Sequence, residues 1–400
     1  MLVGALDLGL ILVGLAPFLV TAYLLLLTAA ACVPRRRGAP TGSGARRFAI
    51  LIPAHNEQAL IGRLLDNLEY LDYPAGQVDV WVVADNCDDS TASIARQRGA
   101  RVLERFDTSQ QAKGFALRWL LEQLAQRGLR YDAYVVLDAD SVVAPNFLRS
   151  MDAHLDVGSQ VIQAYYSVLN AHDSPFASLR YAALAAIHYL RPLGRSALGL
   201  SIGLKGNGMC FASSVLERFP WQWFTLAEDV EFHLALVRAG VRVDFAPETW
   251  VLADMPVTLA QAASQNSRWE RGRLQLLRRV VPGLLRIAVR RRSPVVFDAA
   301  MEQLIPPQSV TLALSGMSLV LGLVLHVPAA AGLGGFSLLG QSMYLMTALV
   351  LVRAPLRVYS AFAYVPVYLL WKMGIYARAL ALPKSERWVR TARTATPDRV

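Results

Sequence analysis

The stretch Phe48-Ala49-Ile50-Leu51-Ile52-Pro53-Ala54-His55-Asn56-Glu57 joins a continuous apolar run to a polar turn. Such a run, closed by a proline, is typical of a parallel strand that is buried on both faces. Asn56 and Glu57 then open a helical pattern. Similar strands follow at residues 78–83, 101–104 and 133–137, and helices at residues 91–98 and 112–126. This alternation predicts an α/β fold with a doubly wound sheet, in which ligands bind beyond the carboxyl ends of the strands.

The composition indicates a membrane protein. Of 400 residues, 54% are hydrophobic and only 18% are charged, whereas soluble domains carry about 25% charged residues. Residues 8–33 are apolar and long enough to span a bilayer. Basic residues follow this run instead of preceding it, which favours a retained anchor with an outside N-terminus over a signal peptide. The net charge of +10 has no nucleic-acid-binding motif beside it, so we expect a lipid bilayer and no nucleic acid as its partner.

The C-terminal part contains three more hydrophobic stretches. Residues 305–327 and 333–352 predict two membrane spans. Residues 358–380 contain Pro366 and Lys372 and precede a basic tail, so the positive-inside rule predicts an interfacial or re-entrant segment with a cytoplasmic C-terminus. We therefore divide the chain into an anchor (1–34), a linker (35–46), a cytosolic catalytic domain (47–256), interfacial amphipathic helices (257–296), two membrane helices (297–354) and a final segment with its tail (355–400).

A pair of aspartates closes the apolar strand at residues 133–137. Asp138 and Asp140 lie two positions apart, and a turn at the strand end can aim both carboxylates at one ion. Mg²⁺ or Mn²⁺ takes oxygen ligands and completes its shell with water or phosphate oxygens. The alternative is a solvated loop with two aspartates. The strand that precedes the pair favours the metal site.

Two further residues fit a bound nucleotide. Asp85 ends the second predicted strand, where its carboxylate can accept a hydrogen bond from the imide N–H of uracil. The alternative role as a helix N-cap suits Asp89 or Ser90 better. Lys113 opens the next predicted helix and can reach a phosphate or the uridine as a point charge. Its alternative is an ordinary surface lysine.

Two later clusters complete the pattern. Glu228 and Asp229 open a helix, where carboxylates are also favoured simply by the helix dipole. Their functional interpretation makes Asp229 the base that removes a proton from an acceptor hydroxyl. In Gln265-Asn266-Ser267-Arg268-Trp269, Arg268 can hold a diphosphate bidentately and Trp269 can present a flat face to a sugar. An ordinary interfacial helix is the alternative, and both interpretations are compatible.

These clusters, taken in order, resemble those of the family 2 membrane glycosyltransferases, which include the cellulose, chitin, hyaluronan and poly-N-acetylglucosamine synthases. The resemblance covers about residues 47–290, and the Gln265-x-x-Arg268-Trp269 box is its most specific part. It implies a GT-A fold, a nucleotide-binding α/β domain, here combined with transmembrane and interfacial helices. The chemistry that it implies is inverting transfer from a UDP-sugar donor with a divalent metal.

The resemblance also assigns site residues. The nucleotide-sugar would contact Pro53, Ala54, Glu57, Asp85, Lys113, Asp138, Gln265, Arg268 and Trp269. Asp138 and Asp140 would serve the metal, and Asp229, with Glu228 beside it, would be catalytic. The acceptor cleft would include Gly206, Asn207, Gly208 and Trp269, although these glycines also suit a plain turn.

The sequence leaves two questions open: which molecule accepts the sugar, and whether the protein forms an oligomer. We expect a hexosyltransferase that acts on a glycan at the cytoplasmic membrane face, with a membrane lipid as the alternative acceptor, as in ceramide glucosyltransferases of similar layout. Three crossings are fewer than large polymer synthases have, so a polymer channel would need a homo-oligomer or a partner subunit. A transporter or a membrane scaffold would not require the catalytic carboxylates. All of them are present, so we expect an enzyme and not a protein of these two classes.

Overall fold

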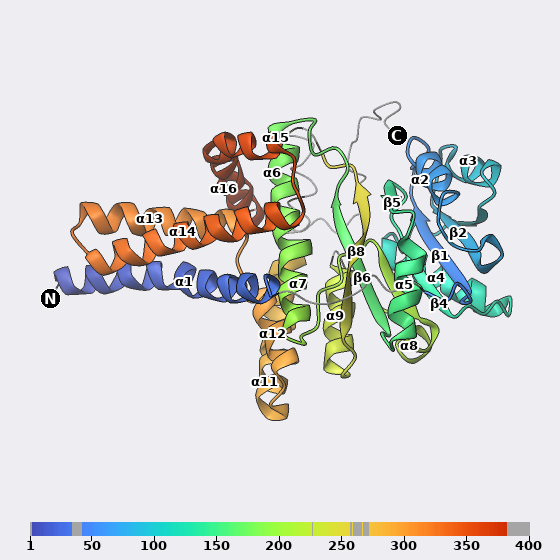
Figure 1. Cartoon of the computed structure of the whole chain (residues 1–400), viewed down its shortest axis with the longest axis horizontal. Coiled ribbons are helices and arrows are strands. Elements are labelled where there is room, and N and C mark those ends of the chain that lie inside the picture. The colour runs from blue at the N-terminus through green and yellow to red at the C-terminus, as the bar shows by residue number, and fades with distance from the viewer. Residues whose placement is uncertain are drawn as a thin grey trace.

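The computed structural model describes residues 2–33, 42–225, 227–256, 258, 266 and 272–381. A mixed α/β domain occupies one end and a bundle of long helices the other, with a layer of crossing helices between them (Figure 1). The strands are β1 (Phe48–Ala54), β2 (Val78–Asp85), β3 (Arg101–Arg105), β4 (Ala133–Val136), β5 (Ser141–Val143), β6 (Val161–Val168), β7 (Met209–Ala212) and β8 (Val243–Ala253). They form one sheet in the order β3-β2-β1-β4-β7-β6-β8-β5.

The first half of the sheet confirms the predicted α/β pattern. Strands β1, β2, β3 and β4 are parallel, and every residue of β1 is buried, as its continuous apolar sequence predicts. The helices between them are α2 (Ile61–Leu68), α3 (Thr91–Gln97) and α4 (Lys113–Gln126). The second half is mixed, because β7 runs antiparallel to both of its neighbours and β5 runs antiparallel to β8. The sheet is therefore not the purely parallel one that a doubly wound pattern implies.

Two hydrophobic cores cover the two faces of this sheet. One contains Ile50, Ile52 and residues of α2 and of α5 (Phe147–Asp156). The other contains Leu51, residues of α4 and of α9 (Glu228–Arg238), and aromatic side chains around Trp221. A short helix, α8 (Ser213–Arg218), contributes to the second core. Because side chains alternate along β1, neighbouring residues of this strand enter opposite cores.

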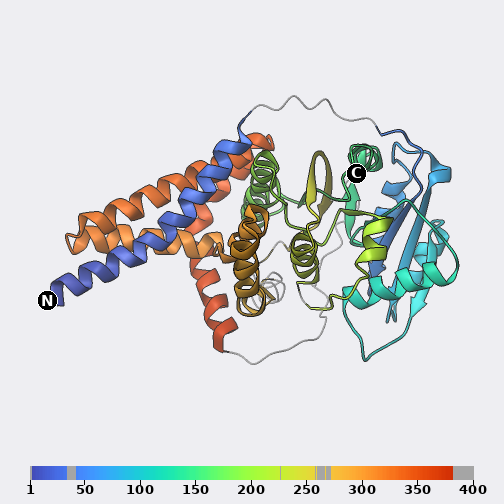
Figure 2. The same ribbon diagram turned by 90° about the horizontal axis from the view of Figure 1, so that it is seen from below.

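The long helices α1 (Leu2–Ala31), α13 (Gln308–Val324) and α14 (Pro328–Leu351) pack side by side as a bundle (Figures 1 and 2). Small residues allow this approach: a Cβ atom added to Gly334 would lie 2.4 Å from the backbone nitrogen of Leu319. In the described part of the chain, Leu6–Ala31 and Pro328–Leu351 are long and apolar enough to cross a membrane. Helices α12 (Pro294–Leu304) and α13 make a third such span only if they are taken together across a bend of 71°.

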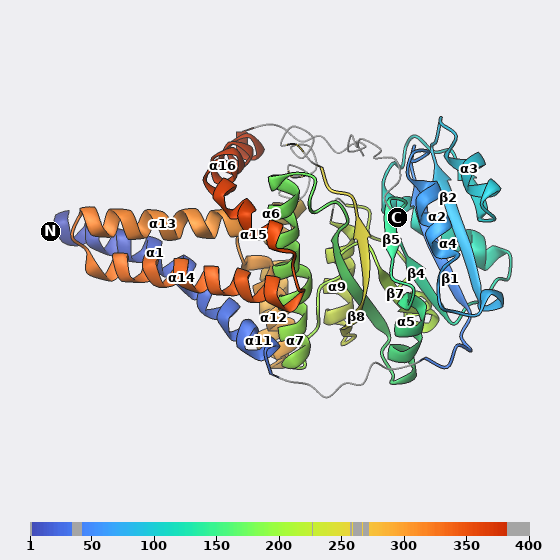
Figure 3. The same cartoon turned by 45° about the horizontal axis from the view of Figure 1, so that its top comes forward.

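The layer between bundle and sheet consists of helices that run across the bundle (Figure 3). Its members are α6 (Pro175–Leu184), the π-helical turn η2 (Ala185–Leu190), α7 (Arg191–Ala197), α11 (Val281–Arg291) and α12. Helices α15 (Leu356–Ser360) and α16 (Val365–Ala381) follow the bundle, joined by the turn η3 (Ala361–Tyr364). Helix α16 also lies across the bundle and is not among the candidate spans. Whether residues 358–380 cross a membrane stays a prediction.

A proline pair separates the crossing layer from the bundle. Pro306 and Pro307 follow α12, and α13 begins at Gln308. Proline cannot donate a backbone hydrogen bond inside a helix and restricts the residue before it. The membrane helix predicted for residues 305–327 therefore begins at Gln308, three residues after the predicted start at Ile305. Residues 297–304 belong to α12 in the crossing layer.

Candidate active site

The predicted site residues that the structure describes converge at one edge of the sheet. Parallel pairing of β1 with β2 sets Pro53 opposite Val83 and Ala54 opposite Ala84. Asp85 is the last residue of β2, and Asp138 follows β4 on the other side of β1. Because the carboxyl ends of parallel strands share an edge, Asp85 and Asp138, 53 positions apart in sequence, border one space.

Asp85 is fully buried and pairs with an arginine that the sequence analysis did not single out. The guanidinium Nη1 of Arg105, the last residue of β3, lies 2.6 Å from Asp85 Oδ1. The other carboxylate oxygen, Oδ2, is buried and makes no hydrogen bond within the described part of the chain. Burial raises the pKa of Asp85, and Arg105 opposes this rise. An acceptor oxygen is therefore available for one N–H donor of a ligand.

Hydrogen bonds connect the loop after β1 to the segment after β2. The backbone N–H of Glu57 donates to Thr91 Oγ1 at 2.8 Å, and the Nδ1 atom of His55 lies 2.7 Å from the Asp85 carbonyl oxygen. Asn56 has a φ of 56°, a left-handed conformation that asparagine tolerates. The helical pattern that was predicted from Asn56 begins as α2 only at Ile61. Glu57 thus lies in the loop that borders the site, not inside the helix.

Lys113 connects the aspartate pair to the glycine loop. Its Nζ atom lies 2.5 Å from Asp138 Oδ1 and 2.5 Å from the carbonyl oxygen of Gly206. Burial lowers the pKa of Lys113, but Asp138 and then Glu228 raise it more, so the net direction is upward. Lys113 is a half-buried cation, with 16% of its side chain exposed, that contacts two other site residues.

Asp138 and Asp140 differ in exposure. The Asp138 side chain is 35% exposed, whereas Asp140 is only 5% exposed and its backbone oxygen accepts a hydrogen bond from Arg63. Among the described residues, no group of three or more acidic, histidine or cysteine side chains is placed to hold a metal. The chain here offers two hard carboxylates, which fits a divalent ion whose remaining ligands are phosphate oxygens and water.

The segment Gly206-Asn207-Gly208 lies directly against the carboxylate pair of α9. Gly206 and Gly208 have φ values of 76° and 70°, a region that favours glycine. A Cβ atom on Gly206 would lie 3.3 Å from Asp229 Oδ2, and one on Gly208 would lie 2.7 Å from Val251 Cγ2. The buried Asn207 accepts the Asp138 backbone N–H through Oδ1 at 3.1 Å. The three residues therefore join β4 to α9.

Glu228 and Asp229 form the first turn of α9, as predicted. Burial, and then Asp229, raise the pKa of Glu228 to about 7, although Lys113 lowers it. Burial also raises the pKa of Asp229, against the backbone N–H of Val230 and the charge of Lys113. Two carboxylates with raised proton affinity, beside the half-buried Lys113, suit general acid–base chemistry near neutral pH.

Two more residues at the site were not found from the sequence. Tyr166, on β6, is half-buried, and burial followed by the charge of Asp138 raises its pKa. Lys205 precedes the glycine loop, and burial lowers its pKa. Neither lies in a recognisable motif, although the position of Lys205 beside Gly206-Asn207-Gly208 is a signal that could have been used.

The box residues Gln265, Arg268 and Trp269 lie outside the described residues, so their roles stay predictions. Asn266, inside the box, accepts a hydrogen bond from the buried Lys372 Nζ at 2.6 Å. Lys372 belongs to α16. This contact connects the box to the helix at the end of the described chain.

Known proteins share this sequence pattern. The chain is 30% identical over 239 residues to the beta-monoglucosyldiacylglycerol synthase of Trichormus variabilis, which covers 57% of this chain and 49% of that protein. It is 22% identical over 276 residues to glucomannan 4-beta-mannosyltransferase 1 of Oryza sativa subsp. japonica, with 66% of this chain and 53% of that protein covered. The chain thus spans about half the length of these curated relatives.

Known structures share the fold. A mannosyltransferase from Pyrobaculum calidifontis, PcManGT, solved in complex with GDP-Man and Mn²⁺, matches with a TM-score of 0.54 and 18% identity, over 87% of this chain and 98% of that one. The predicted GT-A fold is thereby confirmed. The model of the family described as "Glycosyltransferase like family 2" matches residues 45–272, which is more than half of the chain. The chain therefore belongs to the glycosyltransferase-like family 2.

Proposed function

We propose that the protein transfers a sugar from a UDP-sugar to a hydroxyl group of a membrane lipid, with inversion at the anomeric carbon. The observation that carries this proposal is the position of Lys113. Its amine contacts both Asp138 and the Gly206 carbonyl oxygen, and Gly206 lies against Asp229. Donor and acceptor residues from four separate sequence clusters thus border one space.

The nucleotide would lie across the ends of β1, β2 and β4. Asp85 Oδ2, buried and without a hydrogen bond among the described residues, would accept the imide N–H of uracil. Pro53, Ala54 and Glu57 would border the base and ribose, because they end β1 and begin the adjoining loop. Arg268 and Gln265 would hold the diphosphate.

Asp138 and Asp140 would hold a divalent cation, Mg²⁺ or Mn²⁺. When bound, the cation would neutralise charge on the departing diphosphate. The half-exposed Asp138 carboxylate is accessible to such an ion. Lys113 would add a second positive charge beside the same phosphate oxygens, since it already contacts Asp138.

Asp229 would act as the general base. The acceptor hydroxyl oxygen attacks the anomeric carbon from the side opposite the diphosphate, and its proton passes to the Asp229 carboxylate. The bond between that carbon and the diphosphate oxygen breaks, and the electron pair leaves with UDP. Because attack and departure are on opposite sides, the product is inverted. Burial would keep the pKa of Asp229 above its ordinary value, which increases its strength as a base.

The lipid acceptor is supported by the name of the bacterial synthase, which indicates a diacylglycerol-based product, and by the crossing helices that lie between the catalytic domain and the helix bundle. The sequence alone favoured a glycan, with a lipid as the alternative. The glucomannan mannosyltransferase relative keeps the glycan as the second candidate. The basic segments that flank the membrane helices would place the catalytic domain on the cytoplasmic side.

The purified full chain, reconstituted in nanodiscs with mixed lipids, tests this proposal. Radiolabelled UDP-glucose, UDP-galactose and UDP-N-acetylglucosamine would be supplied separately, with Mn²⁺ or with EDTA. We expect label in the organic extract with one sugar, lost in EDTA. Label only in a water-soluble polymer would overturn the lipid acceptor, and full activity in EDTA would overturn the metal site.

A further inference from the structure

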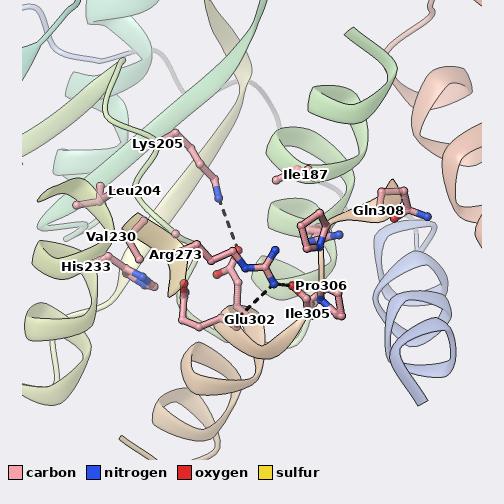
Figure 4. A pocket seen from close by; sticks show the side chains of 14 residues that line it. Ile187, Leu204, Lys205, Val230, His233, Arg273, Glu302, Ile305, Pro306 and Gln308 are labelled. Atoms are coloured by element: carbon pink, nitrogen blue, oxygen red, sulfur yellow. Dashed lines mark hydrogen bonds and ion pairs between the residues drawn. The ribbon is translucent and has the colours of Figure 1, made fainter. Parts of the chain in front are cut away.

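A cavity of about 220 Å³ lies between the catalytic domain and the crossing helices (Figure 4). Its wall combines η2 and α7, the segment before the glycine loop, α9 and the proline turn between α12 and α13. Its polar lining includes Arg191, Lys205, His233, Arg273 and Glu302. Ligand pockets for drug-sized molecules measure about 300–1,000 Å³, so this cavity suits a small polar group and not a chain of sugars.

The cavity adjoins the proposed base. Val230, in its wall, directly follows Asp229, and Lys205 directly precedes Gly206. On the opposite side, Pro306 and Pro307 lie where the crossing layer meets the bundle. A lipid headgroup that entered from the bundle side would therefore reach Asp229 through this cavity.

Arg191 gives the cavity a specific chemistry. It is only 6% exposed, and its Nε atom donates to the Tyr344 hydroxyl at 2.7 Å. Its two Nη groups make no hydrogen bond with any residue that the structure describes. A buried guanidinium whose two Nη groups are available as donors is suited to bind a phosphate through two parallel hydrogen bonds.

The other charges of the lining leave a positive excess. Glu302 Oε1 is 2.6 Å from Arg195 Nη1 and 3.6 Å from Lys205 Nζ. Arg195 Nε also lies 3.0 Å from Asp298 Oδ2. Arg191, Arg195 and Lys205 therefore share the two carboxylates of Glu302 and Asp298, and one positive charge of these three is in excess. A buried charge without a counter-charge is unfavourable, so an anionic occupant would complete the cavity.

His233 adds one neutral hydrogen-bonding group. Its ring points into the cavity from α9 (Figure 4). It is fully buried, with Nε2 at 3.1 Å from Ser201 Oγ and with Nδ1 lacking a partner among the described residues. Burial lowers the pKa of His233 to about 4, so the ring is neutral near pH 7 and can bond to a hydroxyl group.

We propose that this cavity binds the phosphate-bearing headgroup of the acceptor lipid. Arg191 and Lys205 bind the phosphate, and Glu302 is a positioning residue that holds Lys205. His233 and Asp229 face the free hydroxyl of the same headgroup, whose oxygen then attacks the sugar as described above. The inference rests on the proposed function, because it identifies the class of lipid that the same site glycosylates.

The test uses the full chain in nanodiscs of phosphatidylcholine that contain either diacylglycerol or phosphatidylglycerol. We expect kcat/KM to be at least about tenfold higher for phosphatidylglycerol, and glycerol 3-phosphate to compete. Arg191→Gln and Lys205→Gln should each raise the KM for phosphatidylglycerol about tenfold or more while the Kd for UDP stays within about twofold. A photocrosslinking residue at Gln303, in the cavity wall, should capture the lipid even if one variant folds poorly.

Arg290→Gln is the matched control, because Arg290 is exposed on α11 and contributes only general attraction to an anionic surface. The inference is overturned if Arg290→Gln and Arg191→Gln have equal effects, if diacylglycerol is the equal or better acceptor, or if crosslinking at Gln303 captures no lipid. Competition by inorganic phosphate, without capture of lipid, would identify a site for free phosphate and overturn it too. If no lipid in any nanodisc receives sugar although UDP binds, the proposed function itself fails at its acceptor.

Discussion

Glu228 allows the electrostatics of the site to be tested through stability. Burial and Asp229 raise its pKa in the folded protein to about 7, from a reference value of 4.5. Because the folded value is the higher one, the stabilising contribution of protonation is complete below pH 4.5 and is lost as pH rises through 7. The difference between the two values corresponds to about 3 kcal/mol. Glutamine cannot ionise, so the free energy of unfolding of Glu228→Gln should not fall in this way as the pH rises.

The assay compares the thermal unfolding of wild type and Glu228→Gln in one detergent at pH 5 and at pH 8.5. Between these two pH values, the stability of the variant relative to wild type should increase by up to about 3 kcal/mol, which corresponds to about 3–4 °C in Tm for a chain of this length. Glu217→Gln, at an exposed position of α8, should show no such change. A Tm difference between wild type and Glu228→Gln that is the same at both pH values would refute the reasoning.

Three further predictions concern the metal, a buried ion pair and the membrane topology. Asp140→Asn should reduce transfer to background and weaken UDP-sugar binding without unfolding the protein; normal transfer by this variant would contradict the metal site. Arg195→Met should destabilise the protein by about 3–5 kcal/mol, because Arg195 is 1% exposed and lies 3.0 Å from Asp298, and a Tm within 1–2 °C of wild type would contradict this prediction. In intact cells whose native cysteines are replaced by serine, an impermeant thiol reagent should label Leu325→Cys but not Ala395→Cys, and labelling of the latter would indicate a further crossing.

The sequence was most informative where local pattern and burial agree. The run from Phe48 to Ile52 is a central strand because its side chains enter both cores. The helix predicted to begin at Glu228 begins there in the structure. Asp85 and Asp138 could be placed because strand ends are defined by where apolar runs stop.

The sequence was least informative about contacts between distant segments. Arg105 pairs with Asp85 only because β3 lies beside β2, and nothing in the local pattern indicates this ion pair. The antiparallel β7 is a strand of four residues, too short for periodicity to reveal its direction. Arg195 and Glu302 meet across more than 100 residues, so their interaction depends on how the crossing helices pack.

The most direct test of the central proposal separates binding from transfer at Asp229. Asp229→Asn keeps the shape of the side chain but removes a proton acceptor, and general base catalysis contributes about 10²–10⁴-fold. We predict that the variant, in nanodiscs with saturating acceptor lipid, loses transfer by that factor while its Kd for UDP remains near the wild-type value. Near-normal turnover by Asp229→Asn under these conditions would contradict the assignment of the base.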